Sequence, residues 1–309
     1  MITSLKALKA AVAAKSLGFC GADKGGIELS EVQARRVQTG SYETFLLEGG
    51  DPSKETIIFL HGSGPGAGAE TNWRAVLPHF ADDYHVVAPD VFGFGKTDHP
   101  EELPKNPQEW MNERVFQIVN LLDALHKDKA HLVGNSLGGV IALHLLMHAP
   151  HRFDRVVLMG AGGGKYEFTP ELFRLATFHR APTQEALENL FRWFVFDESL
   201  LANELKQIAA ERLEMFSRPE VRRSYEATFA NMHPMDTLIP PSALRRMNHE
   251  ILLIHGYEDR FVPFESSLFM MDYLPNAQLY GIKRCGHWVQ IEQKDRFVKI
   301  TRDFLAQAL

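Results

Sequence analysis

A serine set between two glycines is the first feature of the sequence that could do chemistry. Gly134, Ser136 and Gly138 form a Gly-x-Ser-x-Gly pattern that follows an apolar run at 130–133 and precedes a helical-looking run at 140–147. This order predicts a strand, a sharp turn and a helix, with the serine at the apex. A side chain at either glycine would collide with the neighbouring strand or helix. The pattern therefore predicts a nucleophilic hydroxyl at a helix N-terminus; the alternative is a glycine-rich turn whose serine has no role.

A serine hydroxyl is a weak nucleophile unless a base removes its proton, and the base needs an acid to orient it. Asp259 and His287 each lie in a loop directly after a predicted strand. The carboxyl ends of parallel strands meet at one edge of a sheet, so Ser136, Asp259 and His287 are predicted to form a catalytic triad. Glu258 is the nearest rival for the acid. A buried or capping role is the alternative for His287, because the chain has 14 histidines.

A second glycine-rich loop follows the apolar run 56–60. Gly62, Gly64 and a further glycine two residues on leave backbone amides open to a ligand. We expect the amides of Ser63 and Leu137 to form an oxyanion hole. A phosphate-binding loop is the rival interpretation, but the Gly-Lys-Ser/Thr sequence that it requires is missing.

The elements that must position these loops alternate along the chain. Short apolar runs separated by amphipathic helices predict a doubly wound, mostly parallel α/β sheet. The expected strands are 42–47, 56–60, 85–89, 130–133, 156–159, 251–254 and 277–280. The long helices of this layer are expected at 109–125 and 294–305.

The alternation stops between residues 164 and 246, where the sequence predicts consecutive helices rich in aromatic residues. These helices are expected at 169–178, 183–196, 199–216 and 220–232. Aromatic residues at this density are more often core than binding site. A helical insertion at this place would nevertheless lie over the strand ends, where the same side chains could line a pocket. We therefore expect a core of residues 31–163 and 247–309 and a helical cap of residues 164–246.

The N-terminal extension, residues 1–30, is predicted to be helical. Its segment 5–17 has an apolar stripe of Leu5, Leu8 and Val12, which would pack on the body or on a neighbouring subunit. A membrane-surface role is the alternative.

Composition excludes several other classes of protein. The net charge of −6 and the lack of a basic run argue against nucleic acid or an anionic membrane as the partner. The two cysteines, Cys20 and Cys285, are far apart in sequence, which argues against a disulfide framework and favours a cytoplasmic location. No metal-type spacing of Cys and His is present, and no apolar run approaches the length of a membrane span.

These motifs together resemble the meta-cleavage product hydrolases, which are α/β-hydrolases that split carbon–carbon bonds in ring-fission products of aromatic catabolism. The resemblance runs from about residue 40 to the C-terminus. The segments that carry it are 61–67 (HGSGPGA) with Asn72-Trp73, 134–139 (GNSLGG), 256–263 (GYEDRFVP) and 285–288 (CGHW). Gly-Tyr-Glu-Asp replaces the family's commoner Gly-Arg-Asp-Asp, and residues 1–30 have no counterpart.

The resemblance implies an α/β-hydrolase fold and a two-stage reaction on an acidic dienoate substrate. The dienol is first ketonised and then hydrolysed to a 2-hydroxypenta-2,4-dienoate and a carboxylic acid. By analogy Asn72, Asn135 and Arg212 hold the substrate carboxylate and the adjacent oxygen, and an arginine fork suits a carboxylate. Trp288 packs beside the dienoate, while Gly62, Gly64 and Cys285 line the pocket. No metal or organic cofactor is expected. The protein is expected to form a homo-oligomer.

Three of these assignments have alternatives. The alternative for Arg212 is a surface helix charge paired with a glutamate, and the alternative for Asn72 is a helix N-cap. For the whole chain the alternatives are a carboxylesterase that uses the same triad and a non-catalytic receptor on a hydrolase fold. A serine at 136 disfavours the dehalogenases and epoxide hydrolases of this fold, which need an aspartate there.

Overall fold

A single twisted sheet organises the part of the chain that the computed structural model describes, residues 31–230 and 233–308. Its eight strands lie in the order β1-β2-β4-β3-β5-β6-β7-β8. The β1 and β2 strands form an antiparallel hairpin and β2 pairs antiparallel with β4, whereas every other neighbouring pair is parallel. The strands are β1 (Val32–Thr39), β2 (Tyr42–Gly49), β3 (Thr56–Leu60), β4 (His85–Pro89), β5 (Ala130–Asn135), β6 (Phe153–Met159), β7 (Ile251–Gly256) and β8 (Ala277–Ile282).

Helices cover both faces of the sheet, so the central strands β3, β5 and β7 are buried along their whole length and are mostly apolar. Along β3, Ile58 and Leu60 pack into the apolar cluster under α3 and α4, whereas Ile57 and Phe59 pack into the cluster that contains Trp73. Successive side chains of a strand point to opposite faces, so a doubly covered strand has no polar side. The helices of this layer are α2 (Ala69–Trp73), α3 (Pro107–Ala124), α4 (Leu137–His148), α10 (Glu265–Tyr273), α11 (Val289–Glu292) and α12 (Lys294–Leu305).

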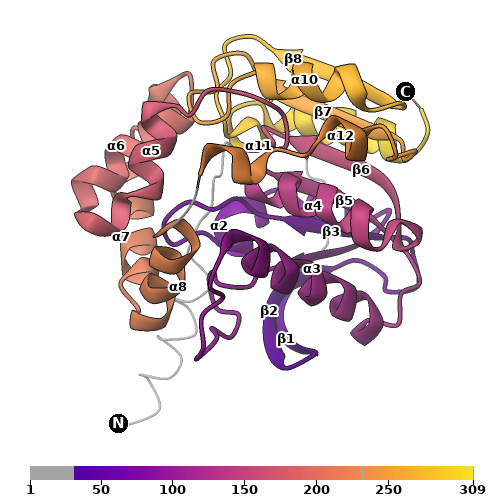
Figure 1. The fold of residues 1–309 in the computed structure, drawn as a ribbon, viewed down its shortest axis with the longest axis horizontal. Coiled ribbons are helices and arrows are strands. Elements are labelled where there is room, and N and C mark those ends of the chain that lie inside the picture. The colour runs from indigo at the N-terminus through magenta and orange to yellow at the C-terminus, as the bar shows by residue number, and fades with distance from the viewer. Residues whose placement is uncertain (1–30, 231–232, 309) are drawn as a thin grey trace, which may run out of the picture.

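Most of the helices between β6 and β7 gather at one side of the molecule, on the left in Figure 1. They are α5 (Pro170–Ala176), α6 (Gln184–Phe194), α7 (Leu205–Phe216) and α8 (Pro219–Ala230). The short α9 (Pro241–Leu244) follows them and contacts α10. The amide of Ile239 donates to the carbonyl of Gly163 at 2.9 Å, so the segment leaves and rejoins the sheet layer at one place. The Arg212 side chain on α7 donates to the Pro65 carbonyl in the loop after β3, so α7 lies beside that loop.

The α/β-hydrolase fold predicted from the sequence is confirmed, with two local corrections. No strand was predicted at β1, because its side chains are mostly exposed and lack an apolar alternation. The helix predicted at 199–216 is divided into a short 3₁₀ turn, Glu198–Leu201, and α7, since the Asp197 side chain accepts from the amide of Ser199 and caps the turn. The helix predicted within residues 1–30 lies outside the described residues.

Among the described residues, no helix is long and apolar enough to cross a membrane. In the same part of the chain, no group of three or more His, Cys, Asp or Glu side chains could hold a metal ion.

Candidate active site

Ser136 occupies the sharp turn between β5 and α4. Its backbone dihedral angles are φ 56° and ψ −117°, a conformation that costs energy for a residue with a side chain. The turn is so tight that a Cβ at Gly138 would lie 2.2 Å from the Leu60 carbonyl oxygen, and one at Gly134 would lie 2.5 Å from the Gly138 oxygen. The two glycines therefore allow the strain that lifts the serine hydroxyl off the sheet.

His287 and Asp259 come together from the loops after β8 and β7. The Nδ1 of His287 lies 2.6 Å from Oδ2 of Asp259, and both side chains are buried. Since an ionised carboxylate only accepts, Nδ1 carries the proton and Nε2 is left to accept from a serine hydroxyl. Glu258, the rival acid, is engaged elsewhere, because its Oε2 accepts from the amide of Cys285 at 3.0 Å.

Asp259 is held as a carboxylate. Burial by itself would raise its pKa, but the His287 and His255 imidazoles and their hydrogen bonds outweigh burial and hold the pKa of Asp259 well below the usual range. Its second oxygen, Oδ1, accepts from the amides of Phe261 and Val262 at 2.8 and 2.9 Å. A carboxylate fixed in this way can orient an imidazole and stabilise its protonated form.

His255 is a neighbour of Asp259 that sequence reasoning missed. It is fully buried at the end of β7, with Nε2 2.8 Å from the Val262 carbonyl oxygen and 3.3 Å from Oδ2 of Asp259. The Ser267 hydroxyl lies 2.7 Å from its Nδ1. Because a carbonyl only accepts, Nε2 carries a proton and is shared between Val262 and Asp259. The sequence signal that could have identified it is its place at the end of a predicted strand, four residues before Asp259.

We expect His255→Phe to lower kcat/KM about tenfold. The variant fills the site but removes a donor from Oδ2, so Asp259 would be held less firmly against His287. His255→Gln keeps a donor and should recover most of the loss. Wild-type kcat/KM in both variants would mean that His255 only fills space.

The predicted oxyanion amides flank the serine. In the described part of the chain, neither the Ser63 nor the Leu137 amide donates to another protein group. Both residues line one cavity together with Ser136. Two free N–H groups beside a nucleophile can stabilise the negative charge that develops on a substrate carbonyl oxygen.

His61 holds the glycine loop that carries Ser63. Its Nδ1 donates to the Gly62 carbonyl at 2.7 Å, and its Nε2 accepts from the amide of Val91 at 2.9 Å. An imidazole can accept at Nε2 only when it is neutral. Burial lowers the pKa of His61 to about 4, although the bond to Gly62 opposes this shift.

This shift predicts a loss of stability in acid. A folded-state pKa below the unfolded value of roughly 6.5 means that the stabilisation is fully present above pH 6.5 and disappears as the pH falls toward 4. Urea unfolding near pH 7 and near pH 4 should show that the wild type loses about 3 kcal/mol more than His61→Asn, which keeps a donor and an acceptor without titrating. Equal losses would contradict the assignment.

A small polar cavity of about 20 Å³ lies on one side of Ser136 and brings together most of the predicted binding residues. It is lined by Gly62, Ser63, Gly64, Ala67, Asn72, Asn135, Ser136, Leu172, Leu175, Phe194, Arg212, Phe261, His287 and Trp288. Residues far apart in the sequence therefore surround the same few atoms of any ligand.

Arg212 is the cation of this cavity, and its predicted alternative as a surface charge is wrong. The residue is only 4% exposed, and no described carboxylate forms an ion pair with it. Its Nε donates to the Pro65 carbonyl at 2.7 Å and its Nη1 to the Thr71 hydroxyl at 3.0 Å. Burial lowers the pKa of Arg212 to about 10, so the guanidinium remains charged at neutral pH. Among the residues that the structure describes, this buried positive charge has no counter-ion.

Asn72 supplies an unused donor beside this charge. It lies within α2, whose N-cap is Gly68, so the N-cap alternative is also wrong. Its Nδ2 is buried and has no hydrogen-bond partner in the described part of the chain. A buried donor without a partner is costly, which favours a ligand at this point.

Asn135 and Trp288 also line the small cavity. The Nδ2 of Asn135 donates to the Met159 carbonyl at 3.2 Å, and the Trp288 ring stacks on Phe194 with centroids 4.5 Å apart. A Cβ at Gly64 would lie 2.9 Å from the Arg212 Nη2, so this glycine makes room for the guanidinium.

The prediction that Cys285 lines the pocket is wrong for the cavities described here. Cys285 is fully buried in the apolar cluster that contains Trp73, and it lines neither cavity at Ser136. Its Sγ lies 3.7 Å from the Gly286 carbonyl oxygen. Burial raises the pKa of its thiol above the ordinary value for cysteine. Its carbonyl packs against Gly256, where a Cβ would lie 2.3 Å from that oxygen.

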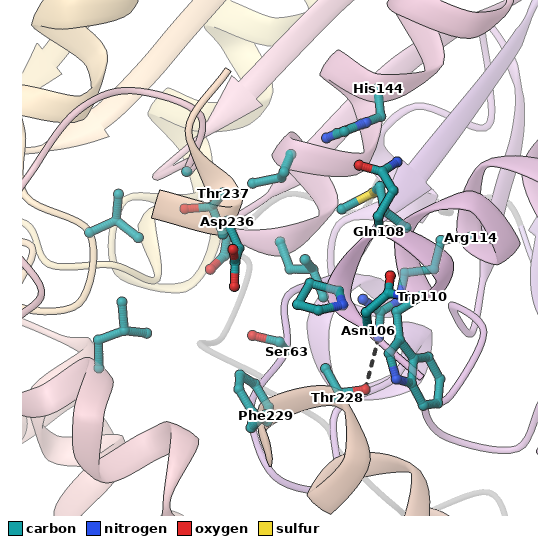
Figure 2. A pocket seen from close by; sticks show the side chains of 18 of the residues that line it. Ser63, Asn106, Gln108, Trp110, Arg114, His144, Thr228, Phe229, Asp236 and Thr237 are labelled. Carbon is teal, nitrogen blue, oxygen red and sulfur yellow. Dashed lines mark hydrogen bonds between the residues drawn. The ribbon is translucent and has the colours of Figure 1, made fainter. Parts of the chain in front are cut away.

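A larger cavity of about 400 Å³ also adjoins Ser136, and Figure 2 shows side chains that line it, among them Ser63, Trp110 and Phe229. Ser63, Ser136 and Leu172 line both cavities, so the two spaces adjoin at the nucleophile. Together they form a site whose small polar part and larger part meet at the serine.

Comparison with known proteins agrees with this geometry. The model of the alpha/beta hydrolase family matches residues 57–300. A 2-hydroxy-6-oxo-2,4-heptadienoate hydrolase of Pseudomonas putida is 37% identical over 88% of this chain and 96% of its own. A 2-hydroxy-6-oxo-6-phenylhexa-2,4-dienoate hydrolase of Rhodococcus, 38% identical, superimposes with a TM-score of 0.86 over 90% of this chain and 99% of its own.

The chain belongs to the meta-cleavage product hydrolases. A serine hydrolase from the polyaromatic hydrocarbon-degrading bacterium Cycloclasticus zankles is also similar, with 41% identity and a TM-score of 0.86 over 89% of this chain and 98% of its own. Bacillus subtilis carboxylesterase, at 20% identity, shares the fold.

Proposed function

We propose that this chain hydrolyses a carbon–carbon bond in a 2-hydroxy-6-oxohexa-2,4-dienoate, giving a 2-hydroxypenta-2,4-dienoate and a carboxylic acid. The observation that carries the proposal is the buried guanidinium of Arg212, which has no carboxylate partner in residues 31–230 and 233–308 and lines a cavity with Ser136 and His287. A charge in this position is costly unless an anion joins it. The 1-carboxylate of the dienoate is such an anion, and relatives at 37% identity are named for dienoate substrates.

The substrate would bind with its carboxylate on Arg212 and its 2-oxygen near Asn72 and Asn135. Its C6 carbonyl would then lie at Ser136, with the oxygen toward the amides of Ser63 and Leu137. The dienol loses its 2-hydroxyl proton and gains one at C5, which gives the ketone. The C5–C6 bond can now break, because the electron pair left on C5 is stabilised as the dienol of the departing fragment.

The chain's own groups supply the proton transfers. His287 accepts the proton of the Ser136 hydroxyl or of a water that Ser136 positions, while Asp259 orients the imidazole and stabilises its charge. Oxygen from water ends on C6 as the carboxylic acid, and a proton ends on the C5 fragment. Both an acyl-enzyme and a gem-diol satisfy this balance.

The test is spectrophotometric. An extradiol dioxygenase generates yellow ring-fission products, and addition of the purified protein should bleach their dienolate absorbance much faster than it hydrolyses a neutral aryl ester. Ester hydrolysis without bleaching of any product would instead favour a carboxylesterase. A fluorophosphonate probe that failed to label Ser136 would favour a non-catalytic receptor.

We also propose that residues 164–246 act as a cap over the site. Glu292 supports this assignment, because its carboxylate accepts from the amides of Phe196 and Asp197 on the cap side and of Gly286 beside His287. We further propose that the protein is cytoplasmic and that it forms a homo-oligomer. The exposed side chain of Tyr280 on the edge strand β8 supports the second of these proposals. Light scattering of the purified chain tests the oligomeric state.

A further inference from the structure

Thr71 holds the guanidinium of Arg212 without lining the small cavity beside Ser136. Its hydroxyl oxygen accepts from Nη1 of Arg212 at 3.0 Å, and the residue is half-buried within α2. Thr71 is absent from the lining of the small cavity, whereas Arg212 is part of it. Both residues line a separate cavity of about 180 Å³. Any effect of Thr71 on a ligand in the small cavity must therefore pass through Arg212.

Every hydrogen-bonding position of the Thr71 hydroxyl is occupied. A hydroxyl has one hydrogen to donate and two lone pairs that accept. The hydrogen is donated to the Gly68 carbonyl at 3.1 Å. The lone pairs accept from the Gly68 amide at 3.3 Å and from Nη1 of Arg212 at 3.0 Å. The direction of the bond to Arg212 is thus fixed, and the hydroxyl has no capacity left to bind a substrate.

The buried carboxylate of Asp90 anchors the start of the helix that carries Thr71. Its Oδ1 accepts from the amide of Ala69 at 2.6 Å, and its Oδ2 accepts from the amide of Lys96 at 2.7 Å. A Cβ at Gly68 would lie 2.7 Å from Oδ1, so the backbone passes close to the carboxylate. The Thr71 hydroxyl is therefore held in place relative to the loop after β4.

The bonds that Arg212 already makes leave one edge of its guanidinium free. A guanidinium has five N–H donors. In residues 31–230 and 233–308, only Nε, which bonds to the Pro65 carbonyl, and one hydrogen of Nη1 have protein acceptors. A Cβ at Gly64 would lie 2.9 Å from Nη2, and Gly64 lines the small cavity. The Nη1–Nη2 edge can therefore take both oxygens of a carboxylate there.

The described groups that hold this guanidinium are neutral. Besides the carbonyl and the hydroxyl, the ring of Phe191 lies 5.3 Å from Cζ of Arg212. Neutral acceptors and an aromatic face stabilise a cation without cancelling its charge. Glu70, the acid next to Thr71, pairs with Arg74 at 2.6 Å instead. A carboxylate at position 71 would form an ion pair with the guanidinium and compete with a bound anion.

We propose that Thr71 is a positioning residue for Arg212. Its neutral hydroxyl fixes Nη1 so that the Nη1–Nη2 edge faces the small cavity, and it keeps that edge available to an anion. Thr71 thereby sets the affinity for the substrate carboxylate without touching the substrate. This proposal rests on the proposed function, which supplies the dienoate carboxylate as the anion.

Two substitutions of Thr71 test the role of the acceptor. Thr71→Val keeps the shape of the side chain but removes the acceptor, so KM for a dienoate should rise about tenfold while kcat changes less than about twofold. Thr71→Ser restores the hydroxyl and should recover nearly the wild-type KM. Hydrolysis of a neutral aryl ester should be unaffected in both variants. A dienoate KM that stays at the wild-type value in Thr71→Val, or an equal rise for the ester, would overturn the proposal.

Thr71→Asp tests the need for a neutral group. The new carboxylate should pair with Arg212 and raise KM for the dienoate at least about 100-fold. Because that pair compensates a buried charge, Thr71→Asp should also melt at a higher temperature than Thr71→Val. A wild-type KM in Thr71→Asp would contradict the proposal.

The melting comparison needs no substrate and so separates this proposal from the proposed function. A wild type that bleaches no ring-fission product would overturn the proposed function. A Thr71→Asp variant that melts no higher than Thr71→Val would overturn the placement of Thr71 against the guanidinium, whatever the wild type bleaches.

A double-mutant cycle tests whether Thr71 acts through Arg212. In the Arg212→Ala background, Thr71→Val should raise KM for the dienoate no further, because the group that it positions is gone. Additive losses would refute the positioning role. The matched control is Thr39→Val on β1, which removes a buried hydroxyl that lies 2.6 Å from the Thr44 hydroxyl and lines neither cavity at Ser136. The control should lower the melting temperature without changing KM for either substrate.

Discussion

Ser136→Ala should reduce bleaching of the preferred ring-fission product by at least about 10³-fold, while the protein still binds the dienolate. The hydroxyl is held in a strained turn beside two free amides, and alanine removes only the oxygen. The turn, the amides and Arg212 remain. Single-turnover spectra should show a bound chromophore that persists, because binding and carbon–carbon cleavage are separate steps.

The matched control for this substitution is Ser217→Ala at the end of α7. Ser217 is exposed, and its hydroxyl donates only to the Leu213 carbonyl. The control should retain wild-type turnover and thermal stability. Turnover in Ser136→Ala above a small residue would mean that the nucleophile has been assigned to the wrong side chain.

Arg212→Ala should lower kcat/KM for dienoate substrates by about 10²-fold or more and for a neutral aryl ester by less than about tenfold. The guanidinium has no counter-ion in the described part of the chain, so the substrate carboxylate would supply one. Arg212→Lys keeps the charge but loses the planar fork, and it should fall between the two. Steady-state rates on both substrate classes make the measurement.

Arg192→Ala is the control for loss of a cap arginine. Its side chain is 37% exposed and pairs with Glu188, so its removal should affect neither substrate. Thermal melts of the two alanine variants separate a binding effect from unfolding, because Arg212 also ties the cap to Pro65 and Thr71. Equal losses on dienoate and ester in a folded Arg212→Ala would remove the carboxylate-binding role.

The fold could be predicted because its signals are local. A strand covered on both faces must be apolar throughout, and β3, β4 and β7 are short apolar runs that end in Gly-containing loops. The strand β1 lacked that signal because it lies at the sheet edge with most of its side chains in solvent. The break before α7 depended on one capping side chain, Asp197, within a stretch that otherwise reads as helix.

The sequence by itself determined the elbow at Ser136 and the strand ends at which Asp259 and His287 lie, since these depend on residues adjacent in the chain. Only the tertiary structure decided the partners of each side chain. Packing joined His287 to Asp259 rather than to Glu258, and it added His255 to the same carboxylate. It also buried Arg212 without a counter-ion among the described residues. Packing turned Cys285 away from the cavities and left two unequal spaces that adjoin the serine. Contacts between distant segments depend on how helices and loops pack, which local sequence patterns do not encode.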